Sequence, residues 1–226
     1  MATSPTSVTH GFTLANPAWA WLILNGHKVI ENRQIKMAPG WYAVHVGAVA
    51  HCGIELELTF RKEFKMPSVM GMKNGHVSGV CKVETAVPHE RVKKNRWAVA
   101  DYKIANIITE VIPFDDGETV PARGNLGNWP LKDAQERVNA LTKEAIALGH
   151  RKKTRAYEEL ADVLDAVGKE GETGKVKRPA KEAPKAQGEA GPPVKKAKRE
   201  AVPSSEPAEA PEPVVKKPGD IRAFFK

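Results

Sequence analysis

The sequence predicts an α+β fold: a small, twisted β-barrel with flanking helices, then a helical extension and a disordered C-terminal tail. Short β-branched runs alternate with a few helical patterns, which favours a mixed domain. All five Trp residues lie between Trp19 and Trp129, so this part of the chain can bury a core. Residues 168–220 contain no aromatic residue, no Leu and no Ile. That stretch cannot offset its own chain entropy.

The first elements follow a polar stretch. Residues 1–10 predict a flexible leader. Residues 17–24 predict a short helix, because Pro17 stands in its first turn and Asn25-Gly26 ends it. Residues 40–46 alternate as a strand. One face of this strand carries Tyr42, Val44 and Val46, and the other carries Trp41, Ala43 and His45.

Three more elements complete the predicted barrel of residues 11–131. Residues 52–64 are ambiguous between strand and helix, and the spacing of their side chains favours a helix. Residues 77–87 are rich in β-branched side chains and predict a strand that Gly79 interrupts. Residues 104–112 predict another strand, which a Pro and a turn bring to an end.

The helical extension, residues 132–167, shows two periodic stretches separated by Gly149. The second stretch opens with four cations, which we expect to neutralise phosphates and add non-specific affinity for nucleic acid. These cations are Arg151, Lys152, Lys153 and Arg155. From residue 168 to residue 217 the composition changes to Lys, Glu, Pro, Ala and Gly, which predicts a disordered linker.

The composition narrows the classes of partner. The net charge is +8, which favours polyanions such as nucleic acid or an anionic membrane surface. No apolar run reaches about 18 residues, so we expect no membrane span, and residues 1–10 lack the layout of a secretory signal. Cys52 and Cys81 lack metal-ligand spacing, which indicates a reducing compartment. We expect neither a metal nor a cofactor.

A charged motif follows the first predicted helix. Within residues 16–33, Gly26 precedes Lys28, Glu31 and Arg33. On an extended strand Glu31 and Arg33 share a face, and a turn after Gly26 can bring Lys28 back toward Glu31. Three such groups held together can bind a polar ring edge or a phosphate. The alternative is an ion-pair network that only pins the helix to the barrel.

This segment resembles the ASCH domain family, relatives of the PUA and EVE domains, which carry a Pro-Trp-Ala helix followed by Gly-x-Lys-x-x-Glu-x-Arg. A later run resembles the family's closing Pro-x-x-Gly-x-x-Gly-x-Trp pattern through Pro121, Gly124, Gly127 and Trp129. The resemblance covers residues 11–131. It implies a PUA-like barrel that holds RNA or DNA, and it leaves open whether a modified or flipped base is bound.

Several residues are candidates for contact with that ligand. We predict that Arg123, in a Gly-flanked loop, lines one cleft with Lys28, Glu31 and Arg33; a solvated loop charge is the alternative for Arg123. A bound base normally needs an aromatic platform, which one of four Trp residues can supply unless all of them pack in the core. The four are Trp19, Trp21, Trp41 and Trp129.

Two other functions remain open for this domain. Some ASCH-like proteins resemble amidases that deacetylate acetylated cytidine with a Lys, a Thr three residues later and a distant Glu. Lys28 matches the Lys, but Glu31 stands in the place of the Thr and the distant Glu has no clear counterpart, which puts that activity in doubt. Lys28 and Glu31 are therefore only candidate catalytic groups, and His45 and His51 are candidate bases that are more often structural. A protein-binding scaffold is the other possibility.

The last nine residues resemble a PIP box, the peptide that binds the sliding clamp PCNA. Ile221, Phe224 and Phe225 have the required spacing, and one helical turn joins the first two into a single apolar plug. Pro218 stands where the usual Gln falls, so this box is degenerate. The alternative is an apolar end without a function.

A basic cluster upstream, at Lys195, Lys196, Lys198 and Arg199, is of the nuclear-import type. It predicts binding to a nuclear import receptor and a nuclear location, with a solvated Lys/Glu linker as the alternative. Import signal and clamp peptide support each other, because the clamp works in the nucleus. The sequence therefore predicts a nuclear protein that binds nucleic acid and PCNA.

Overall fold

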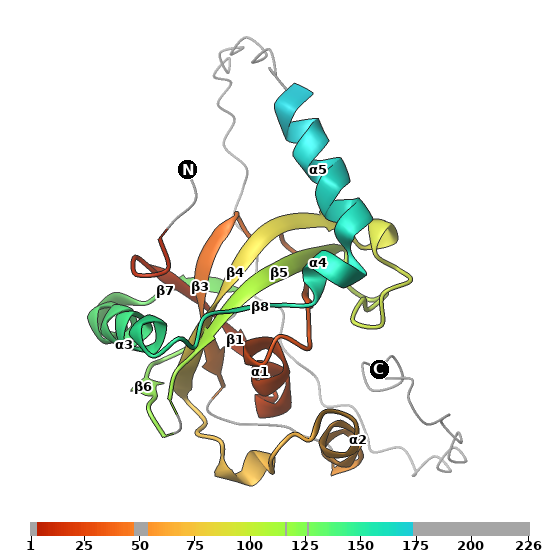
Figure 1. Cartoon of the computed structure of the whole chain (residues 1–226). Coiled ribbons are helices and arrows are strands. Elements are labelled where there is room, and N and C mark those ends of the chain that lie inside the picture. The colour runs from red at the N-terminus through yellow and green to blue at the C-terminus, as the bar shows by residue number, and fades with distance from the viewer. Residues whose placement is uncertain (1–3, 48–53, 116, 126, 174–226) are drawn as a thin grey trace, which may run out of the picture.

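The computed structural model describes residues 4–47, 54–115, 117–125 and 127–173. The predicted α+β class is confirmed: a curled half-barrel sheet carries helices on its sides and at its ends (Figure 1). The strands are β1 His10–Leu14, β2 Ile30–Arg33, β3 Gly40–Val46, β4 His76–Pro88, β5 Ile104–Pro113, β6 Val120–Pro121, β7 Asn128–Pro130 and β8 Lys152–Lys153. The helices are α1 Pro17–Leu24, α2 Ile54–Phe64, α3 Gln135–Ala147, α4 Ala156–Glu159 and α5 Ala161–Thr173, with short 3-10 turns at Val69–Gly71, His89–Arg91 and Lys132–Ala134.

The sheet runs in the order β2-β5-β4-β3-β1-β7, and the short strands β6 and β8 add to β4 and β5. All of these pairs are antiparallel except β1 with β3. The long strands β4 and β5 curve across the centre of the molecule, and α5 extends away from the sheet (Figure 1). The curl brings α1 against β3, β4 and β5.

The two faces of β3 enter different parts of the core. Tyr42, Val44 and Val46 pack with residues of α1, and Trp41 and Ala43 pack with residues of α3. The alternation predicted from the sequence is therefore confirmed. It follows from the period of two in a strand that is buried on both faces.

A third core cluster is rich in aromatic rings and joins α1 to α2. Trp19 lies edge-on to Phe60 at 4.9 Å and to Trp97 at 6.4 Å between ring centroids. Both Trp19 and Trp21 are half-buried and pack against this cluster. Trp97 is fully buried, although no motif in the sequence singles it out.

Two predicted boundaries are wrong. Val8 is fully buried and its N–H donates to Asn139 Oδ1 at 2.9 Å, so the ordered domain begins inside the predicted leader of residues 1–10. At the other end, α5 continues to Thr173, beyond the predicted end of the helical extension at residue 167. The clamp-binding peptide, the import cluster and residues 174–217 of the linker lie outside the described residues.

The second predicted helix does not begin at Arg151. Lys152 and Lys153 are extended and pair with Val111 and Glu110 of β5. Thr154 is still held to β5, because its N–H donates to Thr109 O at 2.9 Å and its hydroxyl donates to Ile108 O at 2.6 Å. Helix α4 starts only at Ala156. Hydrogen bonding to the neighbouring strand thus overrides the local helical pattern.

Gly79 of β4 lies where α1 approaches the sheet, and we expect Gly79→Ala to destabilise the fold. An added Cβ would lie 2.7 Å from Ile112 O and 2.7 Å from Leu24 Cδ2. Overpacking of this kind costs about 1–3 kcal/mol. Urea unfolding monitored by Trp fluorescence measures the difference in the free energy of unfolding.

Gly168→Ala in α5 is the matched control, because a Cβ there meets nothing within 4 Å. Ala favours a helix interior over Gly by roughly 0.5–1 kcal/mol, so this variant should be as stable as the parent or slightly more stable. Equal stabilities for the two variants would contradict the close packing of α1 on β4.

Candidate functional site

The turn after α1 places Lys28 beside the start of β2. Gly26 adopts φ +76°, a conformation that favours Gly, and the N–H groups of His27 and Lys28 both donate to Leu22 O. The chain therefore reverses, and Lys28 Nζ donates to Glu31 Oε2 at 2.8 Å and to the carbonyl of Ile30. The predicted approach of Lys28 to Glu31 is confirmed.

Arg33 completes a charged triad with Lys28 and Glu31. Its Nε lies 2.9 Å from Glu31 Oε1, and its Nη2 donates to Thr13 O at 2.9 Å. The guanidinium also lies over the Phe12 ring, 5.3 Å from the centroid. Arg33 thereby links β2 to β1, two strands that lie on opposite sides of the curled sheet.

Burial and charge compete at Glu31. Burial alone raises the pKa of the carboxyl, but the positive charges and hydrogen bonds of Lys28 and Arg33 outweigh it and leave the pKa below its usual value. Glu31 is thus ionised at neutral pH. Lys28 is 2% exposed and Glu31 5% exposed, so both groups are enclosed, and they form an ion pair with each other. This arrangement supports the interpretation as an ion-pair network that pins the helix to the barrel, and it argues against a ligand-binding cleft.

Arg123 does not share a cleft with Lys28 and Glu31, so that prediction is wrong. Arg123 is exposed and lines an open cleft together with Thr13, His45 and neighbouring loop residues, and this cleft includes neither Lys28 nor Glu31. The loop that carries Arg123 packs on the barrel, where Ala122 N–H donates to Gly75 O at 3.1 Å and Gly124 lies against His45 and Thr13. Arg123 remains placed to meet solvent or a phosphate.

His45 is a structural residue at the floor of that cleft. Its Nε2 donates to Ala122 O at 3.0 Å, so in the neutral ring Nδ1 accepts from Thr13 Oγ1 at 3.2 Å. Thr13 Oγ1 in turn accepts from Trp129 Nε1 at 3.0 Å. Burial lowers the pKa of His45, so the ring is neutral. A Cβ on Gly124 would lie 2.4 Å from the ring, so the loop backbone covers the pair. His45 is therefore enclosed, and His51 lies outside the described residues.

Trp41 and Trp129 pack in the core, so neither of these two candidates supplies an aromatic platform. They are 5% and 6% exposed, and the Arg151 guanidinium lies 5.6 Å from the centroid of the Trp41 ring. Trp21 differs, because it is half-buried and reaches the surface at a cleft. Its indole stacks on the His27 ring at 5.6 Å.

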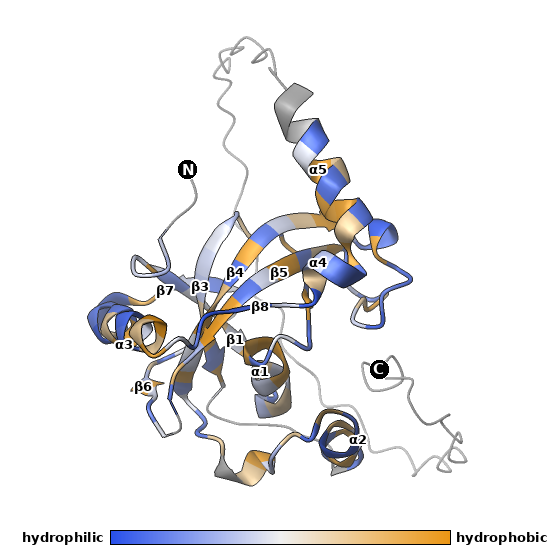
Figure 2. Cartoon of the chain, viewed as in Figure 1, coloured by the Kyte–Doolittle hydropathy of each residue, from blue (hydrophilic) through white to orange (hydrophobic). Residues whose placement is uncertain are grey.

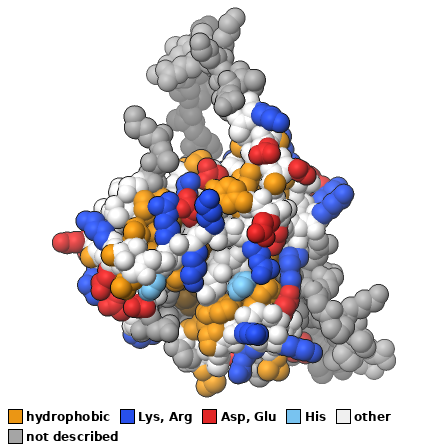
Figure 3. All heavy atoms as spheres, viewed as in Figure 1, with side chains coloured by type: hydrophobic (Ala, Val, Ile, Leu, Met, Phe, Trp, Pro, Cys, Tyr) orange, Lys and Arg blue, Asp and Glu red, His pale blue; other side chains and the backbone are white. Residues whose placement is uncertain are grey.

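The four predicted cations lie together along and beside β8, and all are exposed. Arg151 forms an ion pair with Glu110: its Nη2 lies 2.6 Å and its Nε 2.7 Å from Glu110 Oε2. Lys152, Lys153 and Arg155 form no ion pair among the described residues. Figure 2 shows β8, which pairs with β5, as hydrophilic, and Figure 3 shows Lys and Arg side chains on this face.

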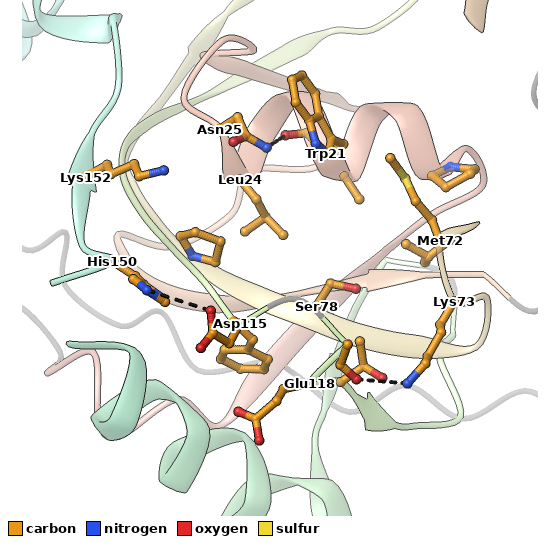
Figure 4. Close-up of a pocket in the computed structure, with 17 residues that line it drawn as sticks. Trp21, Leu24, Asn25, Met72, Lys73, Ser78, Asp115, Glu118, His150 and Lys152 are labelled. Carbon is orange, nitrogen blue, oxygen red and sulfur yellow. Dashed lines mark hydrogen bonds and ion pairs between the residues drawn. The ribbon is translucent and has the colours of Figure 1, made fainter. Parts of the chain in front are cut away.

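A cleft of about 390 Å³ opens next to β8 (Figure 4). Trp21 of α1 and Asn25, directly after that helix, form one wall, with Leu24 beneath them. The Asn25 amide donates to Trp21 O at 2.9 Å. Opposite lie Ser78 of β4, the loop after β5 with Asp115 and Glu118, and His150 and Lys152. His150 Nε2 stands 3.9 Å from Asp115 Oδ1, and Lys73 Nζ donates to Gly117 O at 2.9 Å.

The sequence did not reveal this cleft. Its lining comes from α1, β4, the β5–β6 loop and the segment before β8, and no local motif joins these pieces. The one usable signal was the Asp-Asp-Gly turn at residues 115–117, which marks a loop after a strand.

Within the part of the chain that the structure describes, no three His, Cys, Asp or Glu side chains gather as a metal-binding group. Each described helix is too short or too polar to cross a lipid bilayer. No protein-family model matches this chain, and no curated protein is similar enough to count as a match.

Proposed function

We propose that this protein is a nuclear nucleic-acid-binding module whose domain holds RNA or DNA and whose C-terminal peptide binds PCNA. The observation that carries the proposal is the row of exposed cations on β8. Lys152 and Lys153 lie on a strand that is paired with β5, and Arg155 follows it directly before α4, so the backbone of these cations is already ordered before a ligand binds. The import cluster at residues 195–199 supports the nuclear location.

The distribution of charge makes these positions more important. Residues 174–226 hold 13 Lys and Arg against 7 Asp and Glu, so most of the net charge of +8 lies after α5. The remainder of the chain is close to neutral. Its attraction for phosphates therefore depends on local clusters, and the tail adds a sequence-independent attraction.

The two rival functions have less support. An enzyme that uses Lys28 needs that amine to reach a substrate, whereas Lys28 is buried and donates to Ile30 and Glu31. A protein scaffold would not need cations that are exposed along a single strand. A binding module accommodates both features, with the triad as support for the barrel.

Replacing Lys152, Lys153 and Arg155 with Gln is expected to flatten the salt dependence of binding to a single-stranded oligonucleotide of eight nucleotides (an octamer). Each lost phosphate contact changes the slope of log K against log salt by roughly 0.7 to 0.9, so three contacts give a change of about 2. Fluorescence anisotropy at several salt concentrations measures the slope with the full-length chain.

The control replaces Lys36, Lys94 and Lys103 with Gln. These cations are exposed on loops near the start of β5, away from its pairing with β8, and their loss changes the net charge equally. A slope that changes as much in this control as in the β8 variant would show that the attraction is general and not local to β8.

A further inference from the structure

We propose that the cleft beside β8 holds one nucleotide of a single strand and prefers a base with an exocyclic amino group. This inference rests on the proposed function and names its ligand. The cleft combines an apolar floor, an aromatic wall, carboxylates and a lysine at its edge (Figure 4). Each of these features matches one part of a nucleotide.

The floor and the wall fit a flat ring. Leu24 and Phe114 are buried beneath the cleft, and Met72 and Trp21 are half-buried at its sides. The volume of about 390 Å³ lies in the range of small-ligand pockets and suffices for a nucleoside. Stacking against an indole favours a planar base of any sequence.

The polar groups favour one class of base. Asp115 presents a carboxylate, which only accepts hydrogen bonds, whereas the Glu118 carboxylate lies 4.0 Å from Arg137 Nη2. The Asn25 amide nitrogen donates to Trp21 O, so the Asn25 amide oxygen is left to accept a hydrogen bond. Cytosine, adenine and guanine each offer an exocyclic amino group to such acceptors. Uracil offers carbonyl oxygens at the equivalent position, and these repel a carboxylate.

The phosphate has a partner at the edge of the cleft. Lys152 lines the cleft, whereas its neighbour Lys153 lies over the Tyr157 ring, 5.6 Å from the centroid. Consecutive side chains on a strand point to opposite faces, so the two lysines differ in position but not in chemistry. Lys152 can neutralise the phosphate of the bound nucleotide, and Lys153 and Arg155 can contact phosphates along the strand.

The test is calorimetry of the full-length chain with CMP, AMP and UMP. We expect CMP or AMP to bind roughly tenfold more tightly than UMP, as a well-placed hydrogen bond discriminates between bases. Lys152→Gln should weaken binding of CMP several-fold, whereas Lys103→Gln, at an exposed position that does not line the cleft, should leave it unchanged. Asp115→Asn, at an exposed position, should reduce the preference over UMP.

The aromatic wall has its own control. Trp21→Ala should reduce affinity for CMP roughly tenfold through loss of stacking, and Tyr157→Ala, which removes an exposed aromatic ring outside the cleft, should have no effect. Near-ultraviolet circular dichroism and the melting temperature show whether each variant is folded. The Asp115 and Lys152 variants keep the test decisive if Trp21→Ala does not fold.

Equal affinities for CMP and UMP, or no binding of any mononucleotide at millimolar concentration, would overturn the inference. The proposed function then still stands if octamers bind and the β8 substitutions flatten the salt dependence of that binding. Selective binding of CMP without binding of octamers supports the cleft and contradicts the proposed function. The two failures are therefore distinguishable.

Discussion

Replacing Phe224 and Phe225 together with Ala is expected to reduce the affinity of the C-terminal peptide for PCNA by at least about a hundredfold. Burial of each Phe side chain contributes roughly 1.5–3 kcal/mol, so the double variant loses several kcal/mol. The parent peptide should bind with a micromolar Kd, about −8 kcal/mol. The variant should therefore fall outside the measurable range.

The micromolar estimate follows from the composition of the peptide. Ordering one helical turn around Ile221 costs little, because few residues are involved. Pro218 replaces the usual Gln, and one polar anchor is lost. Lys216, Lys217 and Arg222 should speed the encounter if the clamp rim is acidic.

Calorimetry with a peptide of residues 214–226 tests this prediction. The matched control replaces Val214 and Val215 with Ala, which removes apolar groups upstream of the plug and should leave the affinity nearly unchanged. If the Phe variant binds as well as the parent, or if the parent does not bind at high micromolar concentration, the tail is not a clamp ligand.

Glu31→Gln is expected to lower the free energy of unfolding by about 3–5 kcal/mol. The substitution leaves Lys28 and Arg33 without a countercharge at a site where Lys28 is 2% exposed. Removal of one partner from a buried pair costs that much because the remaining charge stays buried. Urea unfolding at neutral pH measures the loss.

Glu90→Gln provides the control, because Glu90 pairs with Lys93 at 3.5 Å and its side chain is 78% exposed. Surface pairs of this kind contribute at most about 1 kcal/mol. A loss for Glu31→Gln as small as that of Glu90→Gln would show that the triad does not stabilise the barrel.

Acid should remove the contribution of Glu31. Its pKa is lower in the folded chain than in the unfolded chain, so the unfolded state takes up a proton first as the pH falls. The stability from Glu31 is therefore fully present above the unfolded pKa and is lost as the pH falls through the folded pKa. Unfolding curves from pH 7 to about 3 should show a shallower acid limb for Glu31→Gln.

Local patterns in the sequence predicted local structure well. The faces of β3, the start of α1 and the approach of Lys28 to Glu31 follow from periodicity, capping and a Gly turn over a few residues. Strand β8 could not be predicted in this way. Its conformation depends on Val111 and Glu110, about forty residues earlier in the chain.

In the candidate site, too, the sequence predicted what is local and missed what depends on the tertiary fold. The triad lies within residues 28–33, and the sequence located it correctly but did not show that it is enclosed. Burial depends on how the curled sheet closes over the site, as with Trp41 and Trp129. The cleft beside β8 was missed because its walls come from separate elements that meet only in the folded domain.

In the proposed function, the folded domain holds a single strand through β8 and the cleft beside it. Ultraviolet crosslinking of an octamer to the full-length chain, followed by mass spectrometry of the crosslinked peptides, tests it most directly. We predict crosslinks at Trp21 and within residues 150–155. An excess of unlabelled octanucleotide should suppress these crosslinks. Crosslinks confined to residues 174–226, or to the loop that carries Arg123, would contradict the claim.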